Sequence, residues 1–261
     1  MLVFDFDGVL VDGMEEYWWA ARTTALELAA TDGLALDLAR AIPDAFHRLR
    51  PRIHKGWEMV LVAAELGRPG AEPADPAGSL AAPAAAASRQ AYGRALEAAL
   101  GRWGWTPERL QHALERVREA AIRSDRAAWL GRHRFYPGVP ERLSRLAAEG
   151  ADWLVLTTKG AAFAAELLAA AGLEPAALYG HEHGSKPEVL LRLRERRRPL
   201  WFVEDRRPTL EQVRSTQGLE EVRCYLVSWG YLAPEDGDGA AAAGLRWLEP
   251  DRFAAPLADW P

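Results

Sequence analysis

Residues 2–12 read LVFDFDGVLVD, and this stretch decides the fold. Its first three residues, 2–4, are all apolar, which is typical of a parallel strand covered by helices on both faces. Asp5 and Asp7 follow, and alternate side chains of an extended chain share one face. Gly8 then permits a sharp turn. Because open α/β sheets bind ligands at the carboxyl ends of their strands, we expect a ligand site directly after this strand.

The two carboxylates of this stretch predict a metal site. Two close negative charges repel, and both remain ionised readily when a cation lies between them. Carboxylate oxygens are ligands that suit Mg²⁺. The alternative is an acidic turn that caps a helix, because Asp is common in turns and at helix N-termini. The position of Asp5 and Asp7, between a buried strand and a glycine, favours the metal site.

Composition narrows the class of protein. The 261 residues are 49% hydrophobic and 26% charged, enough for a substantial core in one or two domains. The net charge of −5 argues against nucleic-acid binding by bulk electrostatics. The single cysteine, Cys224, lies in an apolar run and is expected in the core. No signal peptide or membrane-spanning run is recognisable, so we expect a cytoplasmic protein without a membrane partner.

Residues 13–134 have helical periodicity throughout. Helices are predicted over residues 14–30, 35–49 with a break at Pro43, 54–66, 88–100 and 106–130. The segment 67–87 is rich in Gly, Pro and Ala and is predicted to be a flexible surface loop. We therefore expect an all-α domain over residues 13–134, inserted after the first strand.

From residue 135 onwards the pattern alternates between strands and helices. Strands are predicted at residues 153–156, 178–179, 200–203, 222–227 and, as an edge strand, 245–248. Residues 233–244 are predicted to be an acidic loop rich in Gly and Ala. Alternation of this kind is typical of a parallel sheet with right-handed crossovers. The predicted fold class is α/β, with a core domain formed by residues 1–12 and 135–261.

Polar residues follow the other predicted strands. Thr157 and Thr158 come after the strand at 153–156, where a hydroxyl group and backbone N–H groups suit a phosphate oxygen. Lys186 precedes a helix, and its ammonium group would neutralise a nucleophilic carboxylate and an incoming phosphoryl group. Glu204 and Asp205 follow the strand at 200–203, and both could reach a Mg²⁺ ion shared with the first strand.

A basic segment lies within the helical region. Residues 47–55 carry three arginines, two histidines and Lys55, with no acidic residue between them. Such a loop could bind the far end of an anionic substrate, and Arg50 and Lys55 are the candidates. The alternative is a surface turn paired with Asp44 and Glu58.

Two other clusters have a simpler reading. His181 and His183 flank Glu182 at a spacing that a transition metal could use, although a polar loop is favoured. The arginines of residues 192–198 are expected to form a solvated helix face rather than a nucleic-acid patch.

The motifs together resemble one family. The sequence DFDGVLVD is similar, nearly letter for letter, to the first motif of the haloacid dehalogenase-like (HAD) phosphohydrolases. Thr157 resembles the second motif, Lys186 with its following proline the third, and Glu204-Asp205 the fourth in its paired-acid form. Thr209 stands where many relatives carry a further acid. The resemblance implies a Rossmann-like parallel sheet core with a helical cap domain inserted after the first motif.

The resemblance also implies a chemistry for these residues. Asp5 would attack a phosphoryl group and form an aspartyl-phosphate, and Asp7 would act as general acid and base. Thr157 and Lys186 would hold the phosphoryl oxygens. The Mg²⁺ ligands would be Asp5, Asp7 through its backbone carbonyl, Glu204 and Asp205. The further substrate-binding candidates are Gly8, Thr158, Arg50 and Lys55.

The expected function is therefore a magnesium-dependent phosphatase acting on a small phosphorylated metabolite. A haloacid dehalogenase would not need an acid at Asp7. Three alternatives remain: a phosphosugar mutase, a phosphonate hydrolase with Lys55 as the Schiff-base lysine, and a phosphometabolite-binding protein without activity. The natural substrate and the oligomeric state stay open.

Overall fold

The computed structural model describes residues 1–69, 78–195 and 199–261. The chain divides into two compact units. The sheet unit comprises Met1–Gly13 and His133–Pro261, and the helical unit comprises Met14–Arg132. Within the described ranges, no helix is both long enough and apolar enough to cross a bilayer.

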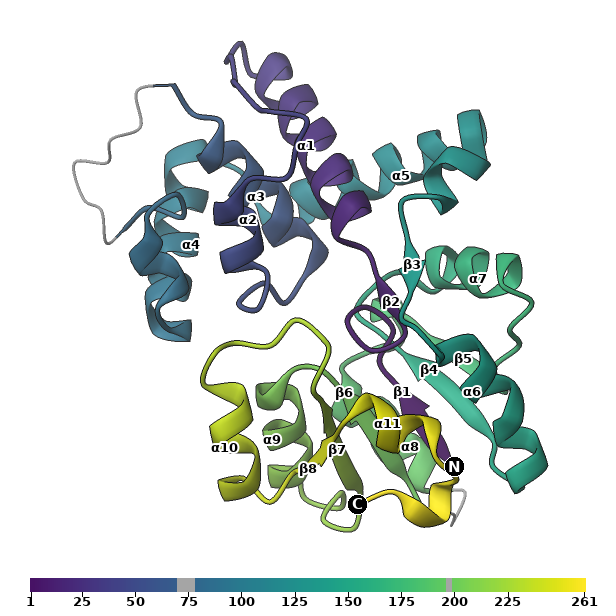
Figure 1. Cartoon of the computed structure of the whole chain (residues 1–261). Coiled ribbons are helices and arrows are strands. Elements are labelled where there is room, and N and C mark those ends of the chain that lie inside the picture. Colours follow the sequence, from purple (N-terminus) through teal and green to yellow (C-terminus); the bar gives the residue numbers. More distant parts are fainter. Residues whose placement is uncertain (70–77, 196–198) are drawn as a thin grey trace. The chain divides into compact units, whose positions relative to one another are not determined.

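The sheet unit contains a six-stranded parallel sheet in the order β5-β4-β1-β6-β7-β8 (Figure 1). Its strands are β1 (Leu2–Phe4), β4 (Trp153–Leu156), β5 (Ala177–Tyr179), β6 (Trp201–Glu204), β7 (Arg223–Val227) and β8 (Arg246–Leu248). This order confirms the predicted α/β class and the edge position of the last strand. It also places β1 between β4 and β6, so the three strands that carry most of the candidate site residues are neighbours.

Helices connect the strands of this sheet and also follow its last strand, β8. They are α6 (Val139–Leu146), α7 (Ala161–Ala170), α8 (Lys186–Arg194), α9 (Arg207–Ser215), α10 (Asp236–Ala242) and α11 (Pro250–Ala254), with short 3-10 helices η3 (Ala147–Glu149), η4 (His181–His183) and η5 (Leu257–Asp259). A separate antiparallel pair, β2 (Val11–Asp12) and β3 (Arg134–Phe135), joins the points where the chain leaves and re-enters the sheet unit. The sequence analysis did not predict this pair, because each strand has only two residues.

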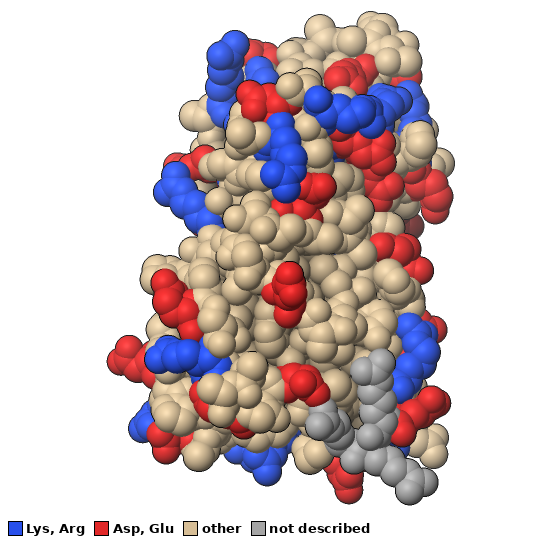
Figure 2. All heavy atoms as spheres, turned by 90° about the vertical axis from the view of Figure 1, so that its right-hand side faces the viewer, with Lys and Arg blue, Asp and Glu red and all other residues tan. Residues whose placement is uncertain are grey.

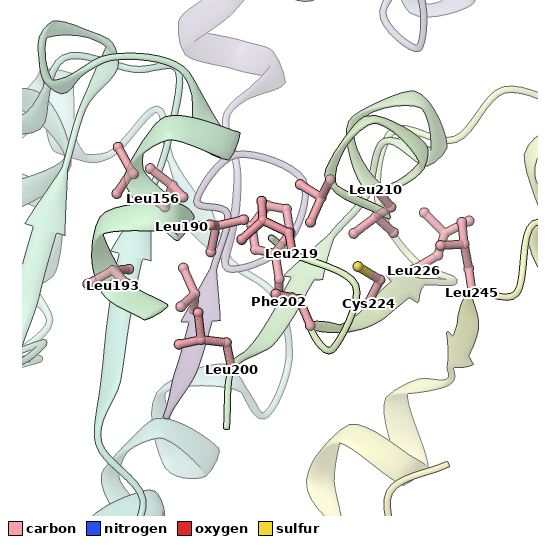
Figure 3. Close-up of a cluster of buried hydrophobic side chains, with 14 of the residues drawn as sticks. Leu156, Leu190, Leu193, Leu200, Phe202, Leu210, Leu219, Cys224, Leu226 and Leu245 are labelled. Carbon is pink, nitrogen blue, oxygen red and sulfur yellow. The ribbon is translucent and has the colours of Figure 1, made fainter. Parts of the chain in front are cut away.

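One face of the sheet is covered by α8, α9 and α10 (Figure 3). Val3 lies in register with Leu154 and Phe202, and Phe202 lies in register with Cys224. All four side chains belong to one buried apolar cluster with residues of these helices. Cys224 is buried in this cluster, which confirms its predicted place in the core, and this burial raises the pKa of its thiol to about 12.

The opposite face carries aromatic side chains. Phe4 lies in register with Val203, and Val203 with Tyr225. Phe4 packs edge-on against Phe253 of α11, and Tyr225 packs edge-on against Trp260. Apolar side chains therefore cover both faces, as the continuous apolar run of β1 predicts.

The described residues of the helical unit form α-helices and a 3-10 helix. They are α1 (Met14–Thr31), α2 (Asp44–Leu49), α3 (Gly56–Leu66), η2 (Pro83–Ala86), α4 (Arg89–Trp103) and α5 (Pro107–Leu130). The start of α5 is as predicted: the Thr106 side chain accepts a hydrogen bond from the Arg109 amide, and Pro107 occupies the first helical position.

The predicted helix at 35–49 is wrong for residues before Pro43, because the helix observed in this range, α2, begins at Asp44. The backbone carbonyls that such a helix would use are bonded to side chains of α1 instead. Arg22 Nε donates to the Leu38 carbonyl, and Trp18 Nε1 donates to the Ala39 carbonyl. These tertiary hydrogen bonds replace the local ones, and propensity alone does not foresee them.

The predicted loop at 233–244 is also wrong, because it contains α10. The Asp236 carboxylate accepts a hydrogen bond from the Ala233 amide, and Ala240 is buried against the core. A Cβ atom at Gly239 would lie 1.4 Å from an Arg207 guanidinium nitrogen. This glycine therefore permits close packing of a helix rather than marking a loop.

The predicted flexible loop at 67–87 lies partly outside the described residues. Residues 70–77 are the ones outside, and the described residues 78–87 differ from the prediction. Leu80 is fully buried, and Ala85 is buried within η2. This part of the segment is packed structure, because its small apolar residues fill space beside α4.

A buried ion pair joins two helices of the helical unit. The Arg118 guanidinium donates two hydrogen bonds of 2.7 Å to the Glu16 carboxylate, and Trp129 Nε1 donates to the same group at 3.4 Å. Glu16 and Arg118 are 0% and 4% exposed. Each charge therefore depends on the other for compensation.

Replacing Arg118 with Met should lower the free energy of unfolding by about 3–5 kcal/mol, because Glu16 would remain buried without its partner. The matched control is Arg116→Met, two residues away, whose exposed pair with Glu27 should contribute less than about 1 kcal/mol. Urea denaturation of both variants provides the measurement. Equal losses would show that burial does not set the strength of the Glu16–Arg118 pair.

Candidate active site

Strands β4, β1 and β6 lie side by side in the sheet (Figure 1), and polar residues follow each of them. Asp5 follows β1, Thr157 follows β4, and Glu204 with Asp205 closes β6. The register aligns Phe4 with Val155 and Val203, so the three strands end at one level. Parallel pairing therefore brings together residues that are far apart in sequence.

Three carboxylates form the centre of this cluster. One oxygen from each of Asp5, Glu204 and Asp205 lies within 4.8 Å of the others, and all three residues are buried. Burial, with repulsion from Glu204, raises the pKa of Asp5 to about 7 despite the opposing charge of Lys186. Burial also raises the pKa of Glu204 to about 7. These groups therefore resist ionisation together unless further positive charge is present.

Lys186 is the cation in contact with this centre. Its Nζ atom lies 2.9 Å from Asp5 Oδ1 and 2.6 Å from Glu204 Oε2. The residue is the first of α8, and that start is fixed by the Ser185 side chain, which accepts a hydrogen bond from the Glu188 amide. Burial alone would lower the pKa of Lys186, but the carboxylates of Asp5 and Glu204 raise it above its ordinary value. The lysine is therefore a permanent positive charge beside Asp5.

Asp7 is paired with a lysine that the sequence analysis did not assign to the site. Lys159 Nζ lies 3.4 Å from Asp7 Oδ1, and Lys159 is only 5% exposed. The Lys159 amide donates to the Thr157 hydroxyl at 3.0 Å, which fixes the turn after β4. Thr157 is buried, whereas Thr158 is half-buried. The scarcity of lysine, three among 32 basic residues, was the available signal for Lys159.

The charge balance of the cluster suits a divalent cation. Four carboxylates (Asp5, Asp7, Glu204 and Asp205) face two ammonium groups, which leaves two negative charges in excess. The buried Oδ1 atoms of Asp5 and Asp7 accept no hydrogen bond of good geometry among the described residues. Oxygen donors with excess negative charge are the ligand set that binds Mg²⁺ or a similar hard cation.

The Asp205 carboxylate is enclosed by two glycines. Gly8 has φ +89°, and a Cβ atom there would lie 2.0 Å from Asp205 Oδ2. A Cβ atom at Gly230 would lie 2.3 Å from Asp205 Cβ. Gly8 was predicted to bind substrate, but its observed contact is with a candidate metal ligand.

The two remaining predicted site residues, Arg50 and Lys55, belong to the helical unit. Both lie in the segment 50–55 that connects α2 to α3. The Arg50 guanidinium lies 5.0 Å from the centre of the Tyr17 ring, and Lys55 is exposed at the start of α3. The structure thus places these two in a different unit from the eight other predicted residues.

Glu58 fixes the shape of this basic segment. Its carboxylate accepts hydrogen bonds from the amides of His54 and Lys55, each at 3.0 Å, and from the Tyr92 hydroxyl at 2.8 Å. The pairing with Glu58, given above as the alternative for this segment, is therefore made through the backbone amides of His54 and Lys55. Burial raises the pKa of Glu58 to about 7, although these hydrogen bonds and the charges of Lys55 and Arg50 oppose the shift.

The histidines near Lys186 have local roles. His183 Nδ1 accepts a hydrogen bond from the Gly180 amide, and Glu182 accepts one from the Ala161 amide at the start of α7. Among the described residues, the cluster with metal-ligand geometry is the one at Asp5, Glu204 and Asp205.

The raised pKa of Glu58 predicts a pH dependence of stability. Because the folded state binds this proton more tightly than the unfolded chain, stability should fall as the pH rises from about 4.5 to about 7. Relative to Glu58→Gln, the wild type should lose up to roughly 3 kcal/mol of unfolding free energy between pH 5 and pH 8. Urea denaturation at both pH values measures the difference, and parallel pH profiles would contradict it.

Replacing Gly8 with Ala should disturb Asp205 as well as the turn. Backbone strain and overpacking together should lower the free energy of unfolding by about 2–5 kcal/mol. Gly138→Ala is the control, because its φ is +78° but no atom lies within 4 Å of the added Cβ. If Gly138→Ala is as harmful as Gly8→Ala in thermal unfolding, the close approach to Asp205 is not the cause.

Known proteins are consistent with this geometry. The family profile of the haloacid dehalogenase-like hydrolases matches residues 1–207. No curated protein matches the chain.

Solved structures share the fold at low sequence identity. A protein of Haemophilus somnus 129PT, described as a predicted phosphoglycolate phosphatase, is 16% identical with a TM-score of 0.60, over 97% of this chain and 94% of its own. A predicted phosphatase of Clostridium acetobutylicum is 14% identical with a TM-score of 0.57, over 95% and 92%. A phosphonoacetaldehyde hydrolase-like protein of Oleispira antarctica is 17% identical with a TM-score of 0.56, over 98% and 89%. With the family profile covering most of its length, the chain belongs to the haloacid dehalogenase-like hydrolases.

Proposed function

We propose that the protein is a magnesium-dependent phosphatase that hydrolyses a small phosphorylated metabolite through an aspartyl-phosphate on Asp5. The observation that carries the proposal is the convergence of Asp5, Glu204 and Asp205 within 4.8 Å, with Lys186 in contact with Asp5. Similar structures described as phosphatases, one of them for phosphoglycolate, support the substrate class. The helical unit would act as the cap domain that reads the leaving group.

In the first step, an Asp5 carboxylate oxygen bonds to phosphorus as the bond to the leaving oxygen breaks. Asp7 donates a proton to that oxygen, and the ammonium group of Lys159, 3.4 Å from Asp7 Oδ1, keeps the carboxyl group in position. Lys186 offsets the negative charge of Asp5 and of the transferred phosphoryl group. The Thr157 hydroxyl and the adjoining backbone amides would hold the phosphoryl oxygens.

In the second step, Asp7 takes a proton from water, and the water oxygen bonds to phosphorus. The bond between phosphorus and Asp5 breaks, which releases inorganic phosphate and restores the carboxylate. A Mg²⁺ ion held by Asp5, Asp205, the Asp7 carbonyl and Glu204 would supply charge neutralisation for both steps. Both carboxylate oxygens of Glu204 already accept hydrogen bonds, Oε2 from Lys186 and Oε1 from the amides of Asp205 and Arg206. Glu204 would therefore reach a cation through water.

Replacing Asp5 with Asn should abolish phosphate release, by roughly 10³-fold or more, because the nucleophile is removed. Asp7→Asn should act similarly, and EDTA should stop the wild type until Mg²⁺ is restored. Phosphate release from p-nitrophenyl phosphate and a panel of phosphorylated metabolites provides the measurement. The control is Asp251→Asn, an exposed acid of α11 that should leave the rate unchanged.

The same assay tests the alternatives. Wild type as inactive as Asp5→Asn on every compound would favour a binding protein. Interconversion of sugar phosphates without phosphate release would favour a mutase.

A second candidate is a phosphonate hydrolase, since one similar structure is described as phosphonoacetaldehyde hydrolase-like. Lys55 is the lysine of the helical unit that could form the required Schiff base, but it is exposed there. Loss of turnover of phosphonoacetaldehyde in Lys55→Arg, with phosphatase activity retained, would support this function.

A further inference from the structure

The loop after β7 reaches the candidate metal site from a direction that no motif of the sequence analysis covers. Trp229, Gly230 and Tyr231 form this loop, here called the WGY segment. Trp229 Nε1 donates a hydrogen bond to the Val9 carbonyl at 3.1 Å. The Cα atom of Gly230 lies against both Asp205 and the Gly8 carbonyl, because an added Cβ would be within 2.5 Å of each. The segment is therefore packed against the turn that follows β1.

Tyr231 makes contacts at both of its ends. Its backbone amide donates to Asp205 Oδ2 at 2.8 Å. Its hydroxyl group donates to Asp12 Oδ1 at 2.7 Å and accepts a hydrogen bond from the Gly13 amide at 2.9 Å. One residue thus connects a candidate metal ligand to the point where the chain leaves the sheet unit.

The contact with Asp205 fixes the orientation of that carboxylate. The Tyr231 amide bonds to Oδ2, and the glycines at 8 and 230 leave no room for the group to rotate freely. Mg²⁺ requires a nearly octahedral set of oxygen ligands, so a small rotation of one ligand weakens binding. Partners that orient metal ligands typically contribute 10- to 100-fold in metal affinity.

The contact with Asp12 and Gly13 fixes the other end. Asp12 is the last residue of β2, and α1 begins one residue after Gly13. The tyrosine side chain is rigid between these hydrogen bonds and its own backbone. A change of backbone conformation at Asp12–Gly13 therefore displaces the Tyr231 hydroxyl and, with it, the amide bonded to Asp205.

We propose that Tyr231 is a positioning residue that couples the orientation of the Asp205 carboxylate to the conformation of the Asp12–Gly13 junction. The proposal rests on the proposed function, in which Asp205 is a Mg²⁺ ligand. Coupling of this kind is reciprocal, so cation binding stabilises the junction as much as the junction stabilises cation binding.

The test is Mg²⁺ affinity, measured by isothermal titration calorimetry on the full chain without substrate. Tyr231→Phe keeps the amide but removes the hydroxyl, and it should raise the Mg²⁺ dissociation constant roughly 10-fold. Tyr225→Phe is the matched control: it removes a buried phenolic hydroxyl from β7 in the same unit and should leave the constant unchanged.

Variants of Asp12 test the coupling from its other end. Asp12→Ala removes the acceptor of the Tyr231 hydroxyl and should weaken Mg²⁺ binding like Tyr231→Phe, whereas Asp12→Asn keeps an acceptor oxygen and should recover most of the affinity. The double variant Asp12→Ala/Tyr231→Phe should bind no more weakly than either single variant, because both break the same connection. If Tyr231→Phe does not fold, the two Asp12 variants still decide the matter.

Two results would overturn the proposal. One is an unchanged dissociation constant in Tyr231→Phe or in Asp12→Ala, and the other is a full sum of the two effects in the double variant. These outcomes differ from failure of the proposed function, in which the wild type neither binds Mg²⁺ nor releases phosphate. An active wild type with unaffected variants would remove only the role of Tyr231.

Discussion

The buried contact between Lys186 and the carboxylates of Asp5 and Glu204 is the interaction on which the site depends. Burial raises the pKa of both Asp5 and Glu204 to about 7, and the charge of Glu204 also repels that of Asp5, so the two groups resist being ionised together. The ammonium group offsets part of this repulsion at distances of 2.9 and 2.6 Å. The remaining negative charge suits a cation, and in the proposed mechanism an ionised Asp5 and a bound divalent ion would stabilise each other.

The fold explains why these charges can be buried together. Strands β4, β1 and β6 are adjacent and in register, so their ends deliver Thr157, Asp5 and Asp205 to one place. Apolar side chains cover both faces of the sheet, which keeps the backbone beneath the cluster rigid. Lys186 enters from the start of a capped helix, where its backbone position is fixed by Ser185. The buried charges at the carboxyl ends of these strands are thus held in place by the apolar packing of the sheet and its helices.

Much of this arrangement could be predicted from the sequence, because it follows from the ends of strands. The sheet and the buried strand at 2–4 required only periodicity and the positions of polar residues. The meeting of Asp5 with Asp205 was expected from the acids that follow the two strands together with the resemblance to the haloacid dehalogenase-like family. The errors at 35–42 and 233–244 have a different origin. There, side chains of Arg22 and Trp18, or close packing of Gly239 against Arg207, decide the local structure from elsewhere in the chain. Predictions from the periodicity of a short sequence segment do not include contacts with distant residues.

The residues that the sequence analysis did not assign to the site share one property. Each contacts a site residue across space, and its position relative to a sequence motif does not predict that contact. Lys159 crosses from the end of β4 to Asp7 through its long side chain. Tyr231 contacts Asp205 through its backbone amide, a group that every residue except proline has. The identity of the residue at position 231 therefore does not predict this contact. Gly8 and Gly230 have no Cβ atom, and this allows their backbone to approach the same carboxylate closely. The orientation of the Asp205 carboxylate, a candidate metal ligand, is therefore set largely by backbone groups. Sequence patterns of charged residues identify such candidate ligands but not the backbone groups that hold them in place.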